Sequence, residues 1–258
     1  MAGIGVPSQR LEPAGAAQAD RLSATYRQSS RATADQLERD PYNRLLARGP
    51  RHRLSAEMIR DGALFLSGLL KEQPGGPSVK PYQPEGLWED VSVERRDKYV
   101  PDADDGIYRR SMYTFWKRTC PPPGMATFDA PDREFCLIRR ARTNTPLQAL
   151  VTLNDPTYVE AARRLAEKVP ALGDTDSRRI RQLFRSVVAR EPDARELEVL
   201  LQLRQDSLAK FQHDPAAVGK LLTVGRAAPD PAHPAEDVAA WAAVCSVVMN
   251  LSEALTKP

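Results

Sequence analysis

Apolar side chains recur at helical spacing over the whole C-terminal part of the chain. The segment 176–190 is the clearest case, because its large apolar residues return every three or four positions and leave charged residues on the opposite face. Similar stripes predict helices over 156–169, 193–212 and 235–255. Since each stripe must be covered by another, we expect a helical bundle over residues 145–258.

Capping signals mark the starts of these helices. Thr145 and Gln148 match a capping box, and Asp193 and Glu196 match a second one. Asp155 stands directly before a proline, which is the favoured order for a cap followed by the first helical position. These side chains accept hydrogen bonds from the free N–H groups of a first turn, so each of the three positions predicts a helix start.

The middle of the chain is interrupted by proline and glycine. A helix begins after Ser55 and is predicted to end at Pro74–Pro77. The segments 75–88 and 120–134 are too rich in proline for regular structure. Between them, residues 107–116 are rich in Tyr, Thr, Phe and Trp, which favours a strand.

These patterns predict a mainly α fold. A C-terminal helical bundle, 145–258, packs against a proline-rich irregular middle region with one or two short strands. Residues 1–22 are polar, weakly periodic and atypical, and we expect them to be disordered. Residues 23–258 then form a single domain.

Composition excludes several classes of protein. The chain has 258 residues, with 37 basic and 34 acidic side chains, and this balance argues against nucleic acid as a partner. No run of 18 apolar residues is present, so no membrane span is expected, and residues 1–22 lack the pattern of a secretory signal. No spacing of Cys and His matches a zinc or haem motif, and we expect no metal and no cofactor in this chain.

The three cysteines leave two readings open. Cys120 and Cys136 pair if the compartment is oxidising, or both remain free thiols. The flanking Phe135 and Leu137 favour a buried, unreactive Cys136. None of the three histidines is placed in the sequence to activate it.

Several long strings in the sequence are distinctive. They are ATYRQSS (24–30), DPYNRLLARGPRHRLSAEMIRD (40–61), GGPSVKPYQPEGLW (75–88), YRRSMYTFWKRT (108–119), FDAPDRE (128–134) and RTNTPLQALVTLNDP (142–156). Together they resemble the domain of unknown function 1553, over about residues 23–258. That domain forms the C-terminal part of large exported proteins of planctomycetes and related bacteria.

The resemblance implies a context more than a mechanism. Family members are long chains in which an export signal and a cytochrome-c-like domain often precede this one, so haem is expected only in that separate domain. The resemblance also implies an exported or cell-envelope location, work on or near polysaccharides, and adjacent domains or partner chains of the same system as partners. Residues 1–22 depart from the family pattern. The family supplies no catalytic residues to transfer.

The polar segment 128–155 is the strongest candidate for a site, because polar residues in irregular backbone often carry function. Asp129 and Glu134 are the candidate catalytic pair if the fold brings their carboxylates together for acid–base chemistry. In the alternative reading, Asp129 caps a turn and Glu134 pairs with a neighbouring arginine.

Arginines and aromatic residues are the candidate ligand-binding groups. Guanidinium groups match carboxylates, phosphates and sulfates, so either an acidic or sulfated glycan or an acidic partner domain is an expected ligand. Aromatic rings could stack on sugars, and internal salt bridges and a local core are the structural alternatives. The candidates are Arg133, Arg139, Arg140, Arg142, Asn144, Tyr82, Trp88 and Trp116.

Two function classes remain open on the sequence. One is a non-catalytic interaction or scaffold domain of a cell-envelope, polysaccharide-processing protein, which the absence of metal and nucleotide motifs favours. The other is a glycan-acting enzyme domain that uses carboxylates in 128–155. Converging carboxylates in a cleft would favour the enzyme.

Overall fold

A computed structural model describes residues 13–257. The described residues divide into two compact units, one built from the chain up to His52 with Thr256 and Lys257, the other from Arg53–Leu255. The predicted boundary after residue 22 falls inside the smaller unit. Residues 1–12, which belong to the segment expected to be disordered, lie outside the described residues, and Pro13–Leu22 form helix α1.

The smaller unit contains α1 and α2 (Ala34–Arg39). Thr33 caps α2 in a full capping box with Gln36, whose side chain accepts from the Thr33 N–H at 3.0 Å. The two-residue strands β1 (His52–Arg53) and β2 (Thr256–Lys257) pair with each other.

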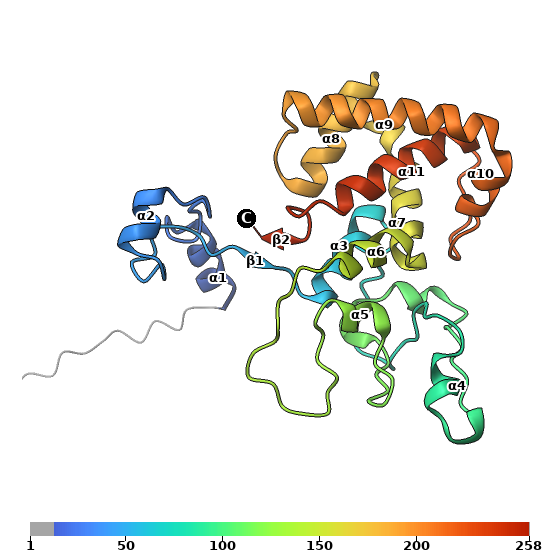
Figure 1. Ribbon diagram of the computed structural model, residues 1–258, viewed down its shortest axis with the longest axis horizontal. Coiled ribbons are helices and arrows are strands. Elements are labelled where there is room, and N and C mark those ends of the chain that lie inside the picture. The colour runs from blue at the N-terminus through green and yellow to red at the C-terminus, as the bar shows by residue number, and fades with distance from the viewer. Residues whose placement is uncertain (1–12, 258) are drawn as a thin grey trace, which may run out of the picture. The chain divides into compact units, whose positions relative to one another are not determined.

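The larger unit is a helical body with irregular connections (Figure 1). Its α-helices are α3 (Ala56–Ser67), α4 (Leu87–Val91), α5 (Pro123–Thr127), α6 (Pro146–Asn154), α7 (Pro156–Ala166), α8 (Asp176–Val188), α9 (Ala194–His213), α10 (Pro215–Leu222) and α11 (Ala235–Met249). Four 3-10 helices join them: η1 (Val93–Arg95), η2 (Asp105–Tyr108), η3 (Ser111–Tyr113) and η4 (Val169–Leu172). The predicted mainly α fold is confirmed.

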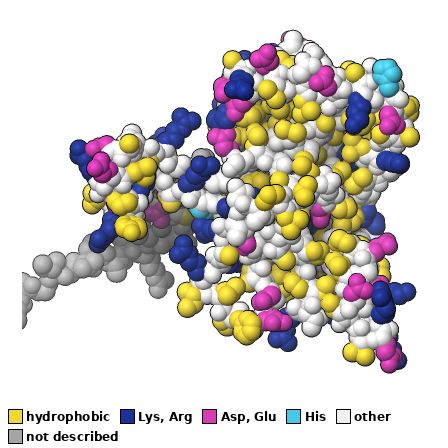
Figure 2. Space-filling view, viewed as in Figure 1, with side chains coloured by type: hydrophobic (Ala, Val, Ile, Leu, Met, Phe, Trp, Pro, Cys, Tyr) yellow, Lys and Arg dark blue, Asp and Glu magenta, His cyan; other side chains and the backbone are white. Residues whose placement is uncertain are grey.

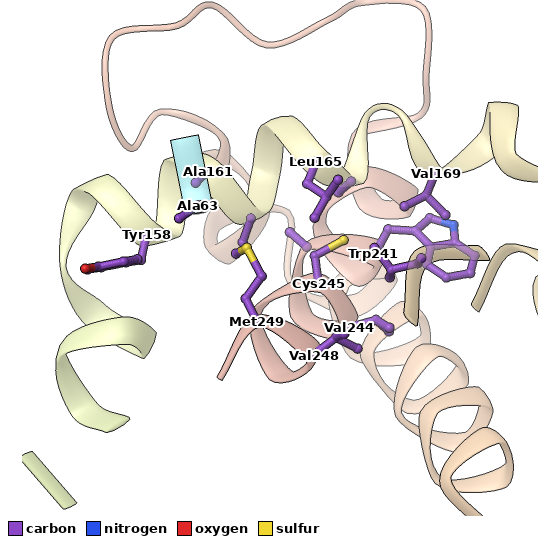
Figure 3. Packing of buried hydrophobic residues seen from close by; sticks show 14 of the residues in the cluster. Ala63, Tyr158, Ala161, Leu165, Val169, Trp241, Val244, Cys245, Val248 and Met249 are labelled. Carbon is purple, nitrogen blue, oxygen red and sulfur yellow. The ribbon is translucent and has the colours of Figure 1, made fainter. Parts of the chain in front are cut away.

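The core lies where α11 packs on α7 and α9. Small residues on α11 and α7, such as Ala161 and Ala239, allow the helices to approach closely, and Trp241 fills the space between them with no exposed surface. Figure 3 shows Leu165 and Val169 beside Trp241 and Cys245. The predicted bundle over 145–258 therefore has a single continuous apolar interior.

The predicted caps are confirmed at two of three helix starts. The Asp155 carboxylate accepts from the Thr157 N–H at 2.9 Å. Asp193 and Glu196 form the expected capping box, in which each carboxylate accepts from the N–H of the other residue at 2.8 Å. The capping box at Thr145 is wrong, because the Thr145 side chain makes no cap bond. Gln148 is instead fully buried, and its amide donates to the Thr127 carbonyl at the end of α5 and to the Thr143 hydroxyl.

Three predictions about the middle region are wrong. The segment 120–134, which was expected to be irregular, contains the short helix α5, with Pro123 at its first helical position. The helix after Ser55 ends at Ser67, because Gly68 adopts φ 75° and closes the last turn. Residues 107–116 contain the end of η2, all of η3 and irregular backbone instead of a strand, although single bridges join Lys71 to Arg109 and Val79 to Thr114. A β-rich composition gives a strand only where a partner strand runs alongside.

The ion pair at the start of α9 predicts a pH dependence of stability. Two hydrogen bonds from Arg190, at 2.7 and 2.8 Å, lower the pKa of Glu196 from 4.5 to about 2, and burial opposes them. Because the pKa is lower in the folded chain, the carboxylate stabilises the fold above its ordinary pKa and loses this effect as pH falls toward 2. When the free energy of unfolding in urea is measured at falling pH, Glu196→Gln should lose less stability between pH 4.5 and about 2 than the unchanged chain does.

Glu198→Gln is the matched control, since Glu198 is exposed on the same helix and makes no ion pair among the described residues. Equal acid profiles for the two variants would contradict the assignment of this pH dependence to Glu196.

Candidate functional site

The connection between α5 and α6 leaves the helical body as a wide loop (Figure 1). Every residue from 132 to 147 is exposed, which we call the exposed segment. Phe135 is 74% exposed, Leu137 55% and Ile138 fully exposed. In the same view, Figure 2 shows hydrophobic side chains at the surface over this loop. The segment therefore presents an apolar run that no other part of the described chain covers.

Asp129 closes the base of the exposed segment. Its carboxylate accepts from the Thr143 N–H at 2.7 Å and from the Thr143 hydroxyl at 2.9 and 3.1 Å. The amide of Gln148 donates to that same hydroxyl at 3.0 Å. These bonds tie the two ends of the segment together, so the side chain of Asp129 is engaged in holding the backbone.

Glu134, the other candidate catalytic carboxylate, lies on the exposed segment itself. Its side chain makes no hydrogen bond or ion pair within residues 13–257, and no hydrogen bond joins it to Asp129. Only its N–H is bonded, to the Asp132 carboxylate at 2.9 Å. The structure thus does not link the candidate pair through any contact.

The candidate arginines divide into paired and unpaired groups. The Arg140 guanidinium pairs with the Glu57 carboxylate of α3 at 2.8 Å. Burial raises the pKa of Glu57, but the hydrogen bond from Arg140 opposes it, and the net effect is a lowered pKa. Arg139, Arg142 and Asn144 have no side-chain partner among the described residues. Two guanidinium groups are therefore free directly after the apolar run.

Arg133 and Trp116 meet where the exposed segment begins. The guanidinium of Arg133 lies 4.5 Å from the centre of the Trp116 ring. The Trp116 indole N–H donates to the Asp132 carbonyl at 2.9 Å. These two candidate residues therefore anchor the segment and leave little of the ring face for a ligand.

The other candidate aromatic residues, Tyr82 and Trp88, make no ring contact with Trp116 among the described residues. The Trp88 ring lies edge-on to the Tyr99 ring, with 5.1 Å between the ring centroids, and it lies tilted against the Phe115 ring, with 5.8 Å between the centroids. The three rings make a small local core. The Tyr82 hydroxyl donates to Glu160 of α7 at 3.0 Å and accepts from the Arg226 N–H. The predicted residues thus do not form one stacking platform.

The sequence did not predict a buried ionic cluster on α7, made of Glu160, Arg163 and Glu167. Glu160 and Arg163 are fully buried; Glu160 accepts from the hydroxyls of Tyr82 and Tyr108, and Arg163 pairs with Glu167 at 2.9 Å. Burial and the bond to Glu160 raise the pKa of Tyr108 to about 12. The spacing of these charges on one helix face was the signal that could have revealed the cluster.

The cysteines are all free thiols. The prediction that Cys136 is buried is wrong, because the apolar residues beside it stand on the exposed segment and cover nothing. Cys245 is buried in the core, and burial raises the pKa of its thiol. Among residues 13–257, no group of His, Cys, Asp and Glu is arranged to hold a metal ion, and no helix is long and apolar enough to span a membrane.

Comparison with known proteins identifies one family. A family model described as "Protein of unknown function (DUF1553)" matches residues 21–204, which is more than half of the chain. The match includes the exposed segment and the helices α2 to α8. No curated protein and no solved structure matches the chain. The chain therefore belongs to the DUF1553 family of proteins of unknown function.

Proposed function

We propose that this chain is a non-catalytic interaction or scaffold domain, and that the exposed segment is the surface it uses to hold its partner. The observation that carries the proposal is the exposed run Phe135, Leu137 and Ile138, followed directly by the unpaired Arg139 and Arg142. Large apolar side chains gathered at one exposed place mark interaction sites more often than they mark ordinary surface.

The chemistry of the segment describes the partner. Apolar side chains gain free energy when a pocket removes them from water, at roughly 25 cal/mol for each Å² of apolar surface. Free guanidinium groups at the edge of such a contact favour carboxylates. We therefore infer a protein partner with an apolar pocket bordered by Asp or Glu, carried by an adjacent domain or a partner chain of the same cell-envelope system.

The contacts of the two candidate carboxylates, Asp129 and Glu134, support binding of a partner over catalysis. Acid–base chemistry on a glycan needs two carboxyl groups that face one substrate bond. The Asp129 carboxylate is already bonded to Thr143, and Glu134 has no positioning partner among the described residues. A glycan-acting enzyme built on this pair is the less supported reading.

Site-specific photo-cross-linking in the producing cell tests the proposal. A photoreactive residue is placed at Leu137, which is 55% exposed, and in a second strain at Val199 on α9, which is 58% exposed. We expect Leu137 to yield one defined protein conjugate, with the cross-link mapped to an apolar patch bordered by carboxylates. Reversing Arg139 and Arg142 to Glu should lower the yield roughly tenfold, because two rim charges at ~0.7 kcal/mol each give that factor.

Equal cross-linking from Leu137 and Val199, or a yield that charge reversal leaves unchanged, would refute the proposal. A glycan array and hydrolysis screen with the purified chain provides the second arm. Turnover that disappears in Asp129→Asn or Glu134→Gln would establish the enzyme reading instead, and capture of a sulfated glycan alone would replace the protein partner.

A further inference from the structure

An apolar pocket of about 220 Å³ lies in the larger unit, with one face of α3 from Met58 to Leu66 as a wall. Its lining also includes Leu54, Val187, Met249, Ala254 and Leu255. The Thr152 hydroxyl in the lining already donates to the Asn250 side-chain oxygen at 2.6 Å. An apolar cavity of about 150 Å³ holds one benzene molecule. The pocket therefore has room for roughly one aromatic ring and one aliphatic side chain.

The mouth of this pocket is open and apolar. Met58 and Phe65 line the pocket and are nevertheless 56% and 70% exposed. Gly62 lies between them in α3, at a position where glycine weakens a helix. A Cβ atom at Gly62 would meet no atom within 4 Å, so no contact in the described chain requires glycine here. Its missing side chain keeps the pocket wide.

The pocket lies close to the exposed segment. Arg140 of the segment donates to the two oxygens of the Glu57 carboxylate at 2.8 and 3.0 Å. Met58, at the pocket mouth, follows Glu57 directly, and Ile138 precedes Arg140 by two residues, which span at most about 7 Å. The ion pair thus brings the apolar run of the segment and the pocket mouth near each other on the surface of the larger unit.

A surface that carries both an apolar run and an apolar pocket can bind a second copy of itself. In a two-fold dimer each copy uses the same patch, so the run of each copy enters the pocket of the other and the contact is made twice. Phe135 supplies a ring, and Leu137 and Ile138 supply branched side chains, which match the room in the pocket. All three side chains lie outside the pocket of their own chain, because each is more than half exposed.

The charges of the two elements have opposite sign. Residues 132–147 carry four arginines and two acidic residues, a net charge of +2. Beside the pocket, Glu253 directly precedes Ala254 of the lining and shares one guanidinium, that of Arg190, with Glu196. Two carboxylates on one cation leave a net charge of −1. An excess of positive charge on the segment and of negative charge by the pocket favours the approach of a second copy.

We propose that the partner of the exposed segment is a second copy of this chain, whose pocket between Met58 and Leu66 receives Phe135, Leu137 and Ile138. The inference rests on the proposed function, because it names the partner of the same segment. Dilute chains are monomers with a free segment. At higher concentration two chains associate and bury both apolar runs and both pocket mouths, which removes this apolar surface from water.

Sedimentation equilibrium of the whole purified chain over a range of concentrations measures this association, and we expect a reversible dimer. Gly62→Leu places a side chain in the pocket and should weaken dimerisation at least about tenfold. Urea unfolding should show no loss of stability for this variant, because leucine is the better helix former and its Cβ atom meets no neighbour. Gly219→Leu on α10 is the matched control, since a Cβ atom there also meets nothing within 4 Å, and it should dimerise like the unchanged chain.

A mixture of two variants separates loss of contact from loss of fold. Leu137→Ser damages the run and keeps the pocket, whereas Gly62→Leu blocks the pocket and keeps the run. Each variant alone has no intact contact. One intact contact forms when the run of the Gly62→Leu copy enters the pocket of the Leu137→Ser copy, so the mixture should dimerise more strongly than either variant by itself.

Photo-cross-linking from Leu137 in a mixture of nitrogen-14 and nitrogen-15 chains locates the contact. We expect conjugates that join the two isotopes and map to residues 58–66. Conjugates within one isotope only would place the segment in the pocket of its own chain and overturn the inference. A monomer at every concentration, or a dimer that Gly62→Leu leaves unchanged, would overturn it too. A defined conjugate with a different protein in the cell would overturn the second copy but uphold the proposed function, which fails if Leu137 yields no defined conjugate at all.

Discussion

Arg163→Met should lower the free energy of unfolding by about 3–5 kcal/mol, the cost of leaving buried carboxylates without their partner. Arg163 has no exposed surface. It donates to Glu167 at 2.9 Å and to the Ala227 carbonyl at 2.5 Å, and it lies 3.9 Å from the equally buried Glu160. Methionine fills much of the volume but carries no donor, so Glu160 loses its neighbouring cation and Glu167 keeps only Arg164 as an ion-pair partner. Urea unfolding followed by circular dichroism measures the loss.

Arg178→Met provides the matched comparison for this effect. Arg178 makes the same type of ion pair on the next helix, with Asp174 at 3.7 Å, but the two side chains are 65% and 77% exposed. Exposed pairs contribute at most about 1 kcal/mol. If the two variants lose stability to within 1 kcal/mol of each other, the contacts of Arg163 with Glu167 and Ala227 do not stabilise the fold as a buried cluster should.

Much of the helical architecture was predictable because helix signals are local. Asp155 and Asp193 cap their helices through residues two or three positions away, and the apolar stripes needed only the 3.6-residue period. The exceptions involved distant partners. Gln148 donates to the Thr127 carbonyl at the end of α5, and the expected strand at 107–116 had no neighbouring strand to complete it.

The candidate site was predicted in part for the same reason. The charged residues of 128–155 and the candidate aromatic residues before them were visible in the sequence, but their contacts were not. Cys136 was expected to be buried because its neighbours are apolar, yet burial depends on what the folded chain places above them. Arg60 donates to groups about fifty positions away, such as the Arg109 carbonyl, and no periodicity predicts such a contact.

The thiols of Cys136 and Cys245 should differ widely in the rate at which a reagent modifies them. Cys136 stands in the middle of the exposed segment, whereas Cys245 is fully buried on α11 and has a pKa that burial raises. A reagent reaches Cys136 without any opening of the fold, but it reaches Cys245 only when the core opens. If opening the core costs about 4 kcal/mol or more, Cys136 should react at least about a thousandfold faster than Cys245.

The exposed segment projects its apolar run into solvent from a folded helical body. Thiol modification of the native chain, with each site followed by mass spectrometry, measures this exposure. We predict that Cys136 reacts at the rate of a short peptide, with Cys120 slower and Cys245 protected until denaturant is added. Protection of Cys136 to within tenfold of Cys245 would show that the segment is packed against the chain, and the proposed contact surface would not exist.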